Sequence, residues 1–245
     1  ASPFYLEGKE YTFFAIHDIS NEKRRKILER VFFHDVLNSA GGISGLSEIL
    51  TEVQDPEEIQ LISKTINRAT ENMINEIQAQ RQLTAAENGD LSPDIKKIWS
   101  LGMVKDVAAL YSGHELVKNK TIHIDKSAED LPTSTDPVIL RRILGNILKN
   151  ALEASIPQST VTLSCREQEN YVCFYVHNPS YMEREIQLQL FNRSFSTKGT
   201  GRGIGTYSMK LLGEKYLKGK VGFESSRENG TTFFIKLAKN GVPEQ

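Results

Sequence analysis

Cysteine is scarce in this chain, with only Cys165 and Cys173 in 245 residues. Two cysteines are too few for a disulfide framework or for a metal site built from cysteine alone. Their spacing fits two neighbouring strands, so we expect both to be small core residues of a reduced intracellular protein. No apolar run is long enough to span a bilayer, and no signal peptide is present. We therefore expect a cytoplasmic chain without direct membrane contact; because it begins at Ala1, a longer, membrane-anchored parent stays open.

The chain also lacks an excess of charge of either sign. Its 30 Lys and Arg residues are balanced by 31 Asp and Glu residues, and no block is rich in Lys or Arg. This balance argues against a general nucleic-acid binder. Hydrophobic residues make up 39% and charged residues 25%, which is ordinary for folded protein, and the length suffices for two modest domains.

Residues 1–19 alternate in a strand-like way around positions 11–16. Two short strands cannot bury a core alone, so we expect this segment to be the end of a domain whose beginning is missing. Residues 11–25 resemble the last strand and exit linker of a PAS sensor domain. The resemblance implies that a PAS-like sensor domain and a linker precede the rest of the chain.

Residues 20–88 carry a helical pattern, for which Ser20 is an N-cap candidate. Apolar residues recur at helical spacing at Leu28, Phe32, Val36, Ile43, Leu46, Leu50 and Val53. Pro56 interrupts this seam and suits the first turn of a second helix. A second seam follows at Ile59, Ile62, Ile66, Ala69, Met73 and Ile77. One hairpin leaves both seams half exposed, so we expect a homodimer whose two hairpins form a four-helix bundle. Packing of the hairpin on its own C-terminal domain is the alternative.

Residues 88–93 are typical of a hinge, and residues 94–240 alternate helices with strands. The pattern predicts helices over 104–117, 137–155, 184–191 and 204–216, and strands over 120–125, 160–167, 171–176, 221–225 and 231–237. Such a mixture predicts an α/β sandwich with helices on one face of a sheet. The predicted fold class is therefore α+β: an N-terminal antiparallel helical hairpin followed by an α/β sandwich domain.

His34 lies inside the first predicted helix, and its side chain points roughly 145° away from the apolar seam. A histidine placed in this way faces water. Asp35 follows directly, and Asn38 lies one turn further on the same face. A carboxylate can hold the proton on one ring nitrogen while the other attacks a phosphoryl group. Asn38 can orient a water or a partner's phosphoryl group. Alone, however, a His-Asp pair on a helix is commonly just part of a solvated face.

Three glycines follow His34 at positions 41, 42 and 45, and each costs about 1 kcal/mol against alanine in a helix. A helix that only packs would not need them. The segment from His34 to Asn38 resembles the H-box of histidine kinases, although Ser39 stands where that family usually has proline. The resemblance implies that His34 accepts a phosphoryl group, with Asp35 and Asn38 as its catalytic neighbours.

Asn146 and Asn150 lie four residues apart on one face of the helix predicted over 137–155. Two amide oxygens suit Mg²⁺, which bridges phosphates and keeps several of its waters. The segment from Asn146 to Glu153 resembles the N-box of the GHKL ATPases, which implies that all three residues bind Mg-ATP. Members that activate water carry a glutamate at the position of Asn146. An asparagine cannot act as a base, so this position favours a kinase over an ATPase.

Asn178 lies just after the strand predicted over 171–176 and aligns with the adenine-binding aspartate of an Asp-x-Gly-x-Gly motif. Ser180 takes the place of the first glycine, and Met182 that of the second. An amide oxygen can still accept a hydrogen bond from the adenine amino group, but without charge assistance. We therefore expect adenine recognition to persist with weaker discrimination.

Residues 191–205 combine two phenylalanines, a Ser-Thr-Lys run and several glycines. Glycines let backbone amides turn toward phosphates, and a helix N-terminus favours anions. The segment resembles the F-box, ATP lid and second G-box of histidine kinases, which implies nucleotide contacts from Thr197, Lys198, Gly199, Gly201, Gly203 and Gly205. The segment beginning at Gly230 matches the family's Gly-Thr-x-Phe, which implies that Thr231 lies near the nucleotide.

These motifs occur in family order over about residues 20–237, and the chain resembles the core of a sensor histidine kinase. The resemblance implies a dimerisation and phosphotransfer hairpin over 20–88 and a GHKL-type (Bergerat) catalytic domain over 94–240. It also implies ATP and Mg²⁺ as cofactors, autophosphorylation of His34, and a response-regulator receiver domain as acceptor and as substrate of a phosphatase activity. Two alternatives stay open. One is a GHKL ATPase or Ser/Thr kinase with an incidental His34; the other is a degenerate dimeric signalling scaffold, indicated by Asn178, Ser180 and Met182.

Overall fold

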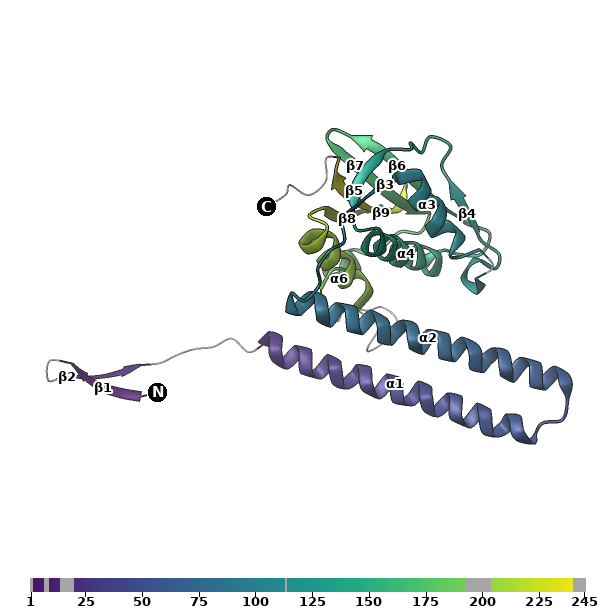
Figure 1. The fold of residues 1–245 in the computed structure, drawn as a ribbon, viewed down its shortest axis with the longest axis horizontal. Helices are drawn as coiled ribbons and strands as arrows, with labels where there is room; N and C mark the ends of the chain where they lie inside the picture. Colours follow the sequence, from purple (N-terminus) through teal and green to yellow (C-terminus); the bar gives the residue numbers. More distant parts are fainter. Residues whose placement is uncertain (1, 7–8, 14–19, 113, 193–203, 240–245) are drawn as a thin grey trace. The chain divides into compact units, whose positions relative to one another are not determined.

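The computed structural model describes residues 2–6, 9–13, 20–112, 114–192 and 204–239 (Figure 1). Contacts divide the chain into two compact units, Ala1–Met73 and Ile74–Gln245. Each unit is described by itself. Among the described helices, none is both long and apolar enough to cross a bilayer.

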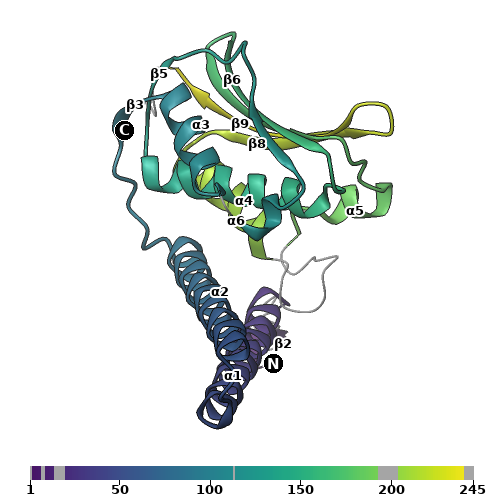
Figure 2. The ribbon, with the colours of Figure 1, turned by 90° about the vertical axis from the view of Figure 1, so that its right-hand side faces the viewer.

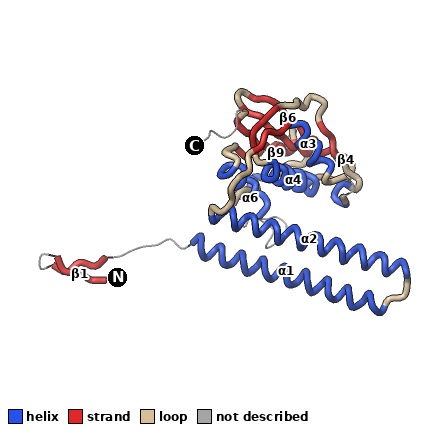
Figure 3. Tube along the Cα trace, viewed as in Figure 1, coloured by secondary structure: helices blue, strands red, loops and turns tan. Residues whose placement is uncertain are grey.

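The first unit contains a two-stranded antiparallel sheet and most of a helical hairpin. Strand β1 (Ser2–Leu6) pairs with β2 (Lys9–Phe13). Helix α1 (Ser20–Glu52) and helix α2 (Pro56–Asn88) form the hairpin, as predicted. Figure 3 shows both as long uninterrupted helices joined by one short loop. The strand predicted around 11–16 is present as β2 up to Phe13, and its remainder lies outside the described residues.

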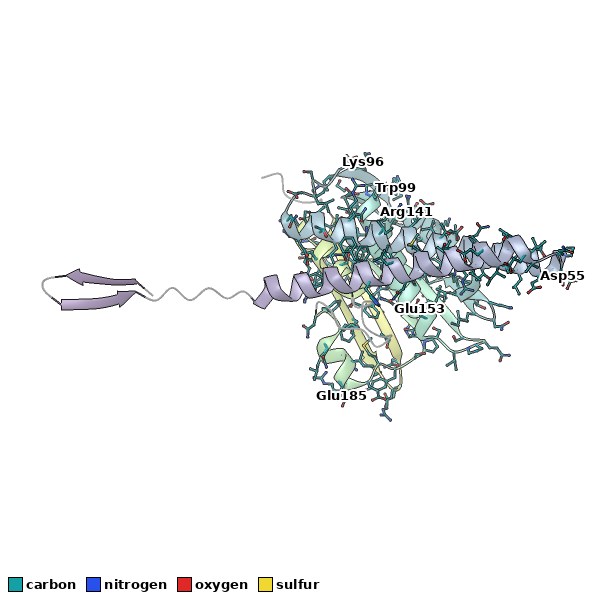
Figure 4. All side chains as sticks on the ribbon, turned by 90° about the horizontal axis from the view of Figure 1, so that it is seen from below. Asp55, Lys96, Trp99, Arg141, Glu153 and Glu185 are labelled. Carbon is teal, nitrogen blue, oxygen red and sulfur yellow. The ribbon has the colours of Figure 1, made fainter. Side chains whose placement is uncertain are left out.

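The turn between the two helices follows from Asp55 and Pro56 (Figure 4). Proline fits the first helical position, where its missing N–H would have no intrahelical partner. The Asp55 carboxylate accepts a hydrogen bond from the Glu57 N–H at 3.0 Å, which caps the start of α2. The predicted break at Pro56 is confirmed.

The two predicted seams are only partly covered. Ile62 is 8% exposed, whereas Ile59 and Ile77 are 36% and 40% exposed. Further apolar side chains of the hairpin are open to solvent, with Leu61 65% and Leu37 71% exposed. The single hairpin therefore presents apolar surface that it cannot bury by itself.

A five-stranded sheet is the centre of the second unit, in the order β4-β6-β7-β9-β8. Its strands are β4 (Thr121–Ile124), β6 (Thr160–Gln168), β7 (Tyr171–Asn178), β8 (Lys220–Ser226) and β9 (Gly230–Ala238). Only β4 and β6 pair in parallel; the other neighbours are antiparallel. Helices α3 (Ser100–Ala109), α4 (Pro137–Ala154) and α6 (Ile204–Leu211) cover one face (Figure 2). The predicted α/β sandwich is confirmed.

Helix α4 is the main helix of the core, and its sequence explains its start and orientation. The Asp136 carboxylate caps its first turn by accepting hydrogen bonds from the backbone of Val138 at 2.8 Å and of Ile139 at 3.0 Å. Eight apolar residues of α4 are buried: Ile139, Leu140, Ile143, Leu144, Ile147, Leu148, Ala151 and Leu152. This stripe fixes which side of the helix faces the sheet.

Two local features differ from the prediction. The helix predicted over 104–117 begins earlier, at Ser100, and ends at Ala109, before a turn and a short 3₁₀ helix (Glu115–Val117). Ser112 and Gly113, both weak helix formers, follow its end. A second small sheet, formed by β3 (Lys96–Trp99) and β5 (Pro132–Thr135), was not predicted at all.

The C-terminal end of α2 belongs to the second unit rather than to the hairpin alone. Leu83 and Ala86 are buried there, and Ala86 is part of the main core. Gly89 has φ +86°, and the Asp90 N–H bonds the Ala85 carbonyl at 3.0 Å, the long hydrogen bond of a Schellman cap. The segment expected to be a hinge is thus a capped helix end in this structure; whether it moves stays a prediction.

Candidate nucleotide-binding site

One face of α4 carries Asn146, Asn150 and Glu153, which lie beside its buried stripe and are half-buried (Figure 4 labels Glu153). Spacings of four and three residues place the three side chains along one line of the helix surface. Two neutral amide oxygens and one carboxylate oxygen in a row are a donor set that suits Mg²⁺. The residues therefore fit the predicted cation, and they keep enough solvent access for phosphates to reach them.

A half-buried phenol, that of Tyr111, holds this helix at the level of the asparagines. The Tyr111 hydroxyl donates a hydrogen bond to the Gly145 carbonyl at 3.1 Å. Burial raises the pKa of Tyr111, so the hydroxyl stays protonated and available as a donor. Tyr111 was not among the predicted site residues, because no pattern in the sequence marks a tyrosine that bonds a helix carbonyl 34 residues away.

Asn178 and Thr231 are direct cross-strand neighbours at the end of β7 and the start of β9. Both are almost fully buried, with exposures of 2% and 3%. Asn178 continues the alternation of the core-facing residues Val172, Phe174 and Val176 on β7, so it points to the sheet face that the helices cover. The structure therefore brings the predicted adenine residue and the predicted threonine together on the α4 side of the sheet.

The loop after Asn178 is fixed by side-chain hydroxyls. The Ser180 hydroxyl donates to the Ala154 carbonyl at the end of α4, at 2.7 Å. The Thr231 hydroxyl donates to the Ser180 carbonyl at 2.7 Å and lies 2.7 Å from the Ser225 hydroxyl. The Met182 N–H donates to that Ser225 hydroxyl at 3.0 Å. Ser180 and Thr231 are thus engaged in holding the loop, a role that the sequence did not indicate.

Gly230 lets the β8–β9 turn approach this loop closely. Its φ is +67°, and a Cβ atom there would lie 2.3 Å from the Asn178 carbonyl oxygen. No side chain fits into that space. On the same turn, the Arg227 guanidinium lies 3.7 Å from the Glu183 carboxylate and 5.3 Å from the centre of the Tyr181 ring. The β8–β9 turn therefore packs closely against the loop that carries the predicted adenine site.

A shallow hollow of about 480 Å³ lies on the opposite side of the same strand ends. It is lined by His177, Pro179, Glu228, Asn229, Gly230 and Thr232. His177 and Thr232 alternate with Asn178 and Thr231 along their strands, so they face away from α4. The hollow is therefore distinct from the site formed by the helix face and the loop.

Comparison with known proteins decides what kind of domain this is. Residues 135–241 match the family described as histidine kinase-, DNA gyrase B- and HSP90-like ATPases. Sensor histidine kinase CusS of Escherichia coli O157:H7 is 29% identical over 65% of the chain. Residues 135–241 are therefore similar to the ATP-binding domains of that family, and the relative that matches the chain is a sensor histidine kinase. The chain spans only 34% of the length of CusS.

Solved structures share the fold of this chain over most of its length. The histidine kinase AdeS of Acinetobacter baumannii matches 85% of this chain and 98% of its own with a TM-score of 0.66, at 16% identity. Histidine kinase ThkA, solved in complex with the response regulator protein TrrA, matches 90% of this chain and 64% of its own with a TM-score of 0.62, at 19% identity. At such identities the likeness establishes the fold alone.

The predicted lid of the catalytic domain falls largely outside the described residues. Thr197, Lys198, Gly199, Gly201 and Gly203 are not described. Gly205 is the second residue of α6, whose start agrees with the predicted helix.

The flanks of that segment are well packed. The Phe191 ring lies 5.8 Å from the ring of Phe223, and the Lys210 ammonium lies 5.1 Å from the centre of the Phe191 ring. Thr206 donates a hydrogen bond to the Leu190 carbonyl at 2.5 Å. The two ends of the predicted lid are therefore held close together, and Phe223 and Lys210 join the residues that the sequence did not single out.

His34 is exposed on α1, as its predicted helix position requires. The Asn38 amide nitrogen lies 3.1 Å from His34 Nδ1 and 3.4 Å from Nε2. The lone pairs of the two ring nitrogens diverge, so one donor cannot lie in line with both. Asn38 therefore packs against the imidazole between its two nitrogens and restrains the ring. The side chain of Asp35 lies outside the described residues.

Proposed function

We propose that this chain is the core of an ATP-dependent protein-histidine kinase of a two-component system, which phosphorylates its own His34 and passes the phosphoryl group to an aspartate of a response regulator. One observation carries the proposal: a domain similar to histidine kinase-, DNA gyrase B- and HSP90-like ATPases follows, in the same chain, a helical hairpin with an exposed histidine. Asn38, one helical turn after that histidine, contacts its ring and restrains the orientation of the ring.

The catalytic domain holds the nucleotide between the face of α4 and the loop after β7. Asn146, Asn150 and Glu153 hold Mg²⁺ and the phosphates. The cation, when bound, neutralises phosphate charge and supports the departure of ADP. Asn178 accepts a hydrogen bond from the adenine amino group, and Thr197, Lys198 and the predicted lid glycines bind the phosphates. Because Asn146 cannot take a proton from water, the site favours transfer to a side chain over hydrolysis.

Phosphoryl transfer to His34 forms one bond and breaks another. An unprotonated ring nitrogen attacks the γ-phosphorus, and the bond from phosphorus to the oxygen of the departing ADP breaks. Asp35 stabilises the proton on the other ring nitrogen as the ring becomes cationic. A receiver aspartate then takes the phosphoryl group, and Asn38 also assists its later hydrolysis by orienting a water. ThkA, which shares this fold, was solved with a response regulator, which supports such a partner.

The functional unit in this proposal is a homodimer. The partly exposed seam residues Ile59 and Ile77 support it because a second hairpin would bury them in a four-helix bundle. The β1–β2 segment belongs to a PAS-like sensor domain that regulates the kinase. Its two paired strands are compatible with such a domain but too short to define one.

Labelling with γ-labelled Mg-ATP tests the function directly. The parent chain and the variant His34→Gln are compared, with His123→Gln as control because His123 is exposed on β4 and has no assigned role. We expect a label that acid removes and alkali preserves, absent only from His34→Gln.

Other outcomes identify the alternatives. A label that survives acid and persists in His34→Gln indicates a Ser/Thr kinase. Released phosphate without label indicates an ATPase. Absence of both label and nucleotide binding indicates a signalling scaffold. Any of these three results contradicts the proposal.

A further inference from the structure

The loop from Asn178 to Met182 is held by hydrogen bonds that connect three separate elements: α4, β8 and β9. Ser225 and Thr231 are cross-strand partners on β8 and β9, and Thr231 is in turn the cross-strand partner of Asn178. Ser180 connects the same loop to the last carbonyls of α4 through Ala154. All of these residues lie in the second unit, on the side of the sheet that carries the nucleotide site.

Each hydroxyl has only one proton, which determines the direction of every bond in the set. Thr231 uses its proton on the Ser180 carbonyl. The bond between Ser225 and Thr231 must therefore be donated by Ser225. Ser225 accepts, in turn, from the Met182 N–H. The result is a one-directional chain of hydrogen bonds from Met182 through Ser225 and Thr231 to Ser180.

The chain of bonds fixes the loop at both ends of the replaced glycine motif. Ser180 and Met182 stand at the two positions where histidine kinases usually have glycine. The Met182 N–H is bonded to Ser225, and the Ser180 carbonyl is bonded to Thr231. Glycines would leave this loop with more conformational freedom, which must be lost when a nucleotide binds. A loop already held in one conformation avoids part of that loss.

We propose that Ser225 is a positioning residue for the adenine end of the nucleotide site, acting through Thr231 on the loop of Asn178 and Ser180. This inference rests on the nucleotide-binding part of the proposed function. It assigns Ser180 and Thr231 to holding the loop, in addition to any contact with the nucleotide. The neutral Asn178 makes such positioning important, because a hydrogen bond without charge assistance depends on geometry for its strength.

Calorimetric titration with ADP and with GDP tests the role of Ser225 in the full chain. Ser225→Ala removes the donor to Thr231 and the acceptor for Met182. We expect the Kd for ADP to rise about 3-fold to 10-fold, from the loss of one to two hydrogen bonds. The Kd for GDP should change less, so that the preference for ADP falls. Ser225→Thr keeps the hydroxyl and should restore both values.

Ser226→Ala is the matched control, because Ser226 is the next residue on β8 and its hydroxyl accepts from the Asn229 N–H of the adjoining turn at 3.1 Å. We expect its Kd for ADP to stay within 2-fold of the parent. A second variant, Ser180→Ala, breaks the bond to Ala154 without altering β8 or β9, and should weaken ADP binding in the same direction. A thermal melt of each variant shows whether it is folded.

The inference is overturned if Ser225→Ala binds ADP as the parent does, if Ser226→Ala weakens binding equally, or if ADP and GDP affinities fall by the same factor. A Ser225→Ala chain that does not fold moves the decision to Ser225→Cys, which keeps a side chain of similar shape but is a weak donor and acceptor; an unchanged ADP affinity of this variant also overturns the inference. A parent that binds ADP but leaves His34 unlabelled contradicts the proposed function while leaving the role of Ser225 intact. A parent that does not bind ADP overturns both.

Discussion

Replacement of Gly230 by alanine should strongly destabilise the catalytic domain. Gly230 has φ +67°, a conformation that costs a residue with a Cβ atom about 1–2 kcal/mol. The added Cβ would also lie 2.3 Å from the Asn178 carbonyl oxygen and 2.7 Å from the Pro179 Cα. Both neighbours are backbone atoms, so the loop after β7 must move as a whole, which adds about 1–3 kcal/mol.

Together these costs amount to about 2–5 kcal/mol of unfolding free energy, which corresponds to roughly 5–15 °C in Tm for a domain of this size. Differential scanning calorimetry of the full chain measures the shift. The control is Gly102→Ala, since Gly102 lies in α3 with nothing within 4 Å of the added Cβ. Alanine is the better helix former, so this control should raise stability by about 1 kcal/mol.

The same experiment extends to function, because the carbonyl that must move belongs to Asn178. The variant Gly230→Ala should therefore also weaken ADP binding at temperatures where it is still folded. A Tm within 2 °C of the parent would contradict this prediction, because it would mean that the β8–β9 turn and the loop after β7 are not in close contact.

Other features of the structure give three further predictions. Leu148→Ala should lower the unfolding free energy by about 2–5 kcal/mol in chemical denaturation, since the side chain is fully buried in α4; a loss below 1 kcal/mol would contradict its place in the core. Ile59→Asp should convert dimers to monomers in sedimentation velocity, because Ile59 belongs to the seam of α2 and is 36% exposed in the single chain; an unchanged dimer would place the interface elsewhere. Cys165 and Cys173 should react slowly with a thiol reagent at pH 8 until the chain unfolds, because burial raises the pKa of both thiols and the reactive thiolate is scarce below that pKa; fast labelling of the folded chain would contradict their burial.

The sequence predicted the features that depend on local pattern. The apolar stripe of α4, the break at Pro56 and the exposed face of His34 follow from helical periodicity and from the backbone chemistry of proline, so the structure agrees with them. The sheet of five strands and its helical layer followed from the alternation of elements.

Features that depend on contacts between distant segments were not predictable. The small sheet of β3 and β5 pairs Lys96 with Thr135, which lie far apart in the sequence. Neither strand is long enough to show an alternation of apolar and polar residues. Ser225 has no motif of its own; its role depends on the register of β8 against β9, which fixes its neighbour as Thr231. Likewise, Tyr111 and Gly230 act through single close approaches to backbone atoms, which a pattern of residue types does not encode.

Hydrogen bonds at the capped end of α2 restrict the conformational freedom of the segment that follows this helix. The Ala86 carbonyl accepts hydrogen bonds from both the Lys215 ammonium and the Tyr216 hydroxyl, beyond the cap at Gly89. A few residues later, the Asp94 N–H is bonded to the Asp136 carboxylate, which also caps α4. Only a short segment, between Ala86 and Asp94, is left to change conformation when α2 rotates. A rotation of the end of α2 about its own axis must therefore either rotate the second unit with it or break the two hydrogen bonds at Ala86. The junction is thus suited to transmit a rotation of the helix.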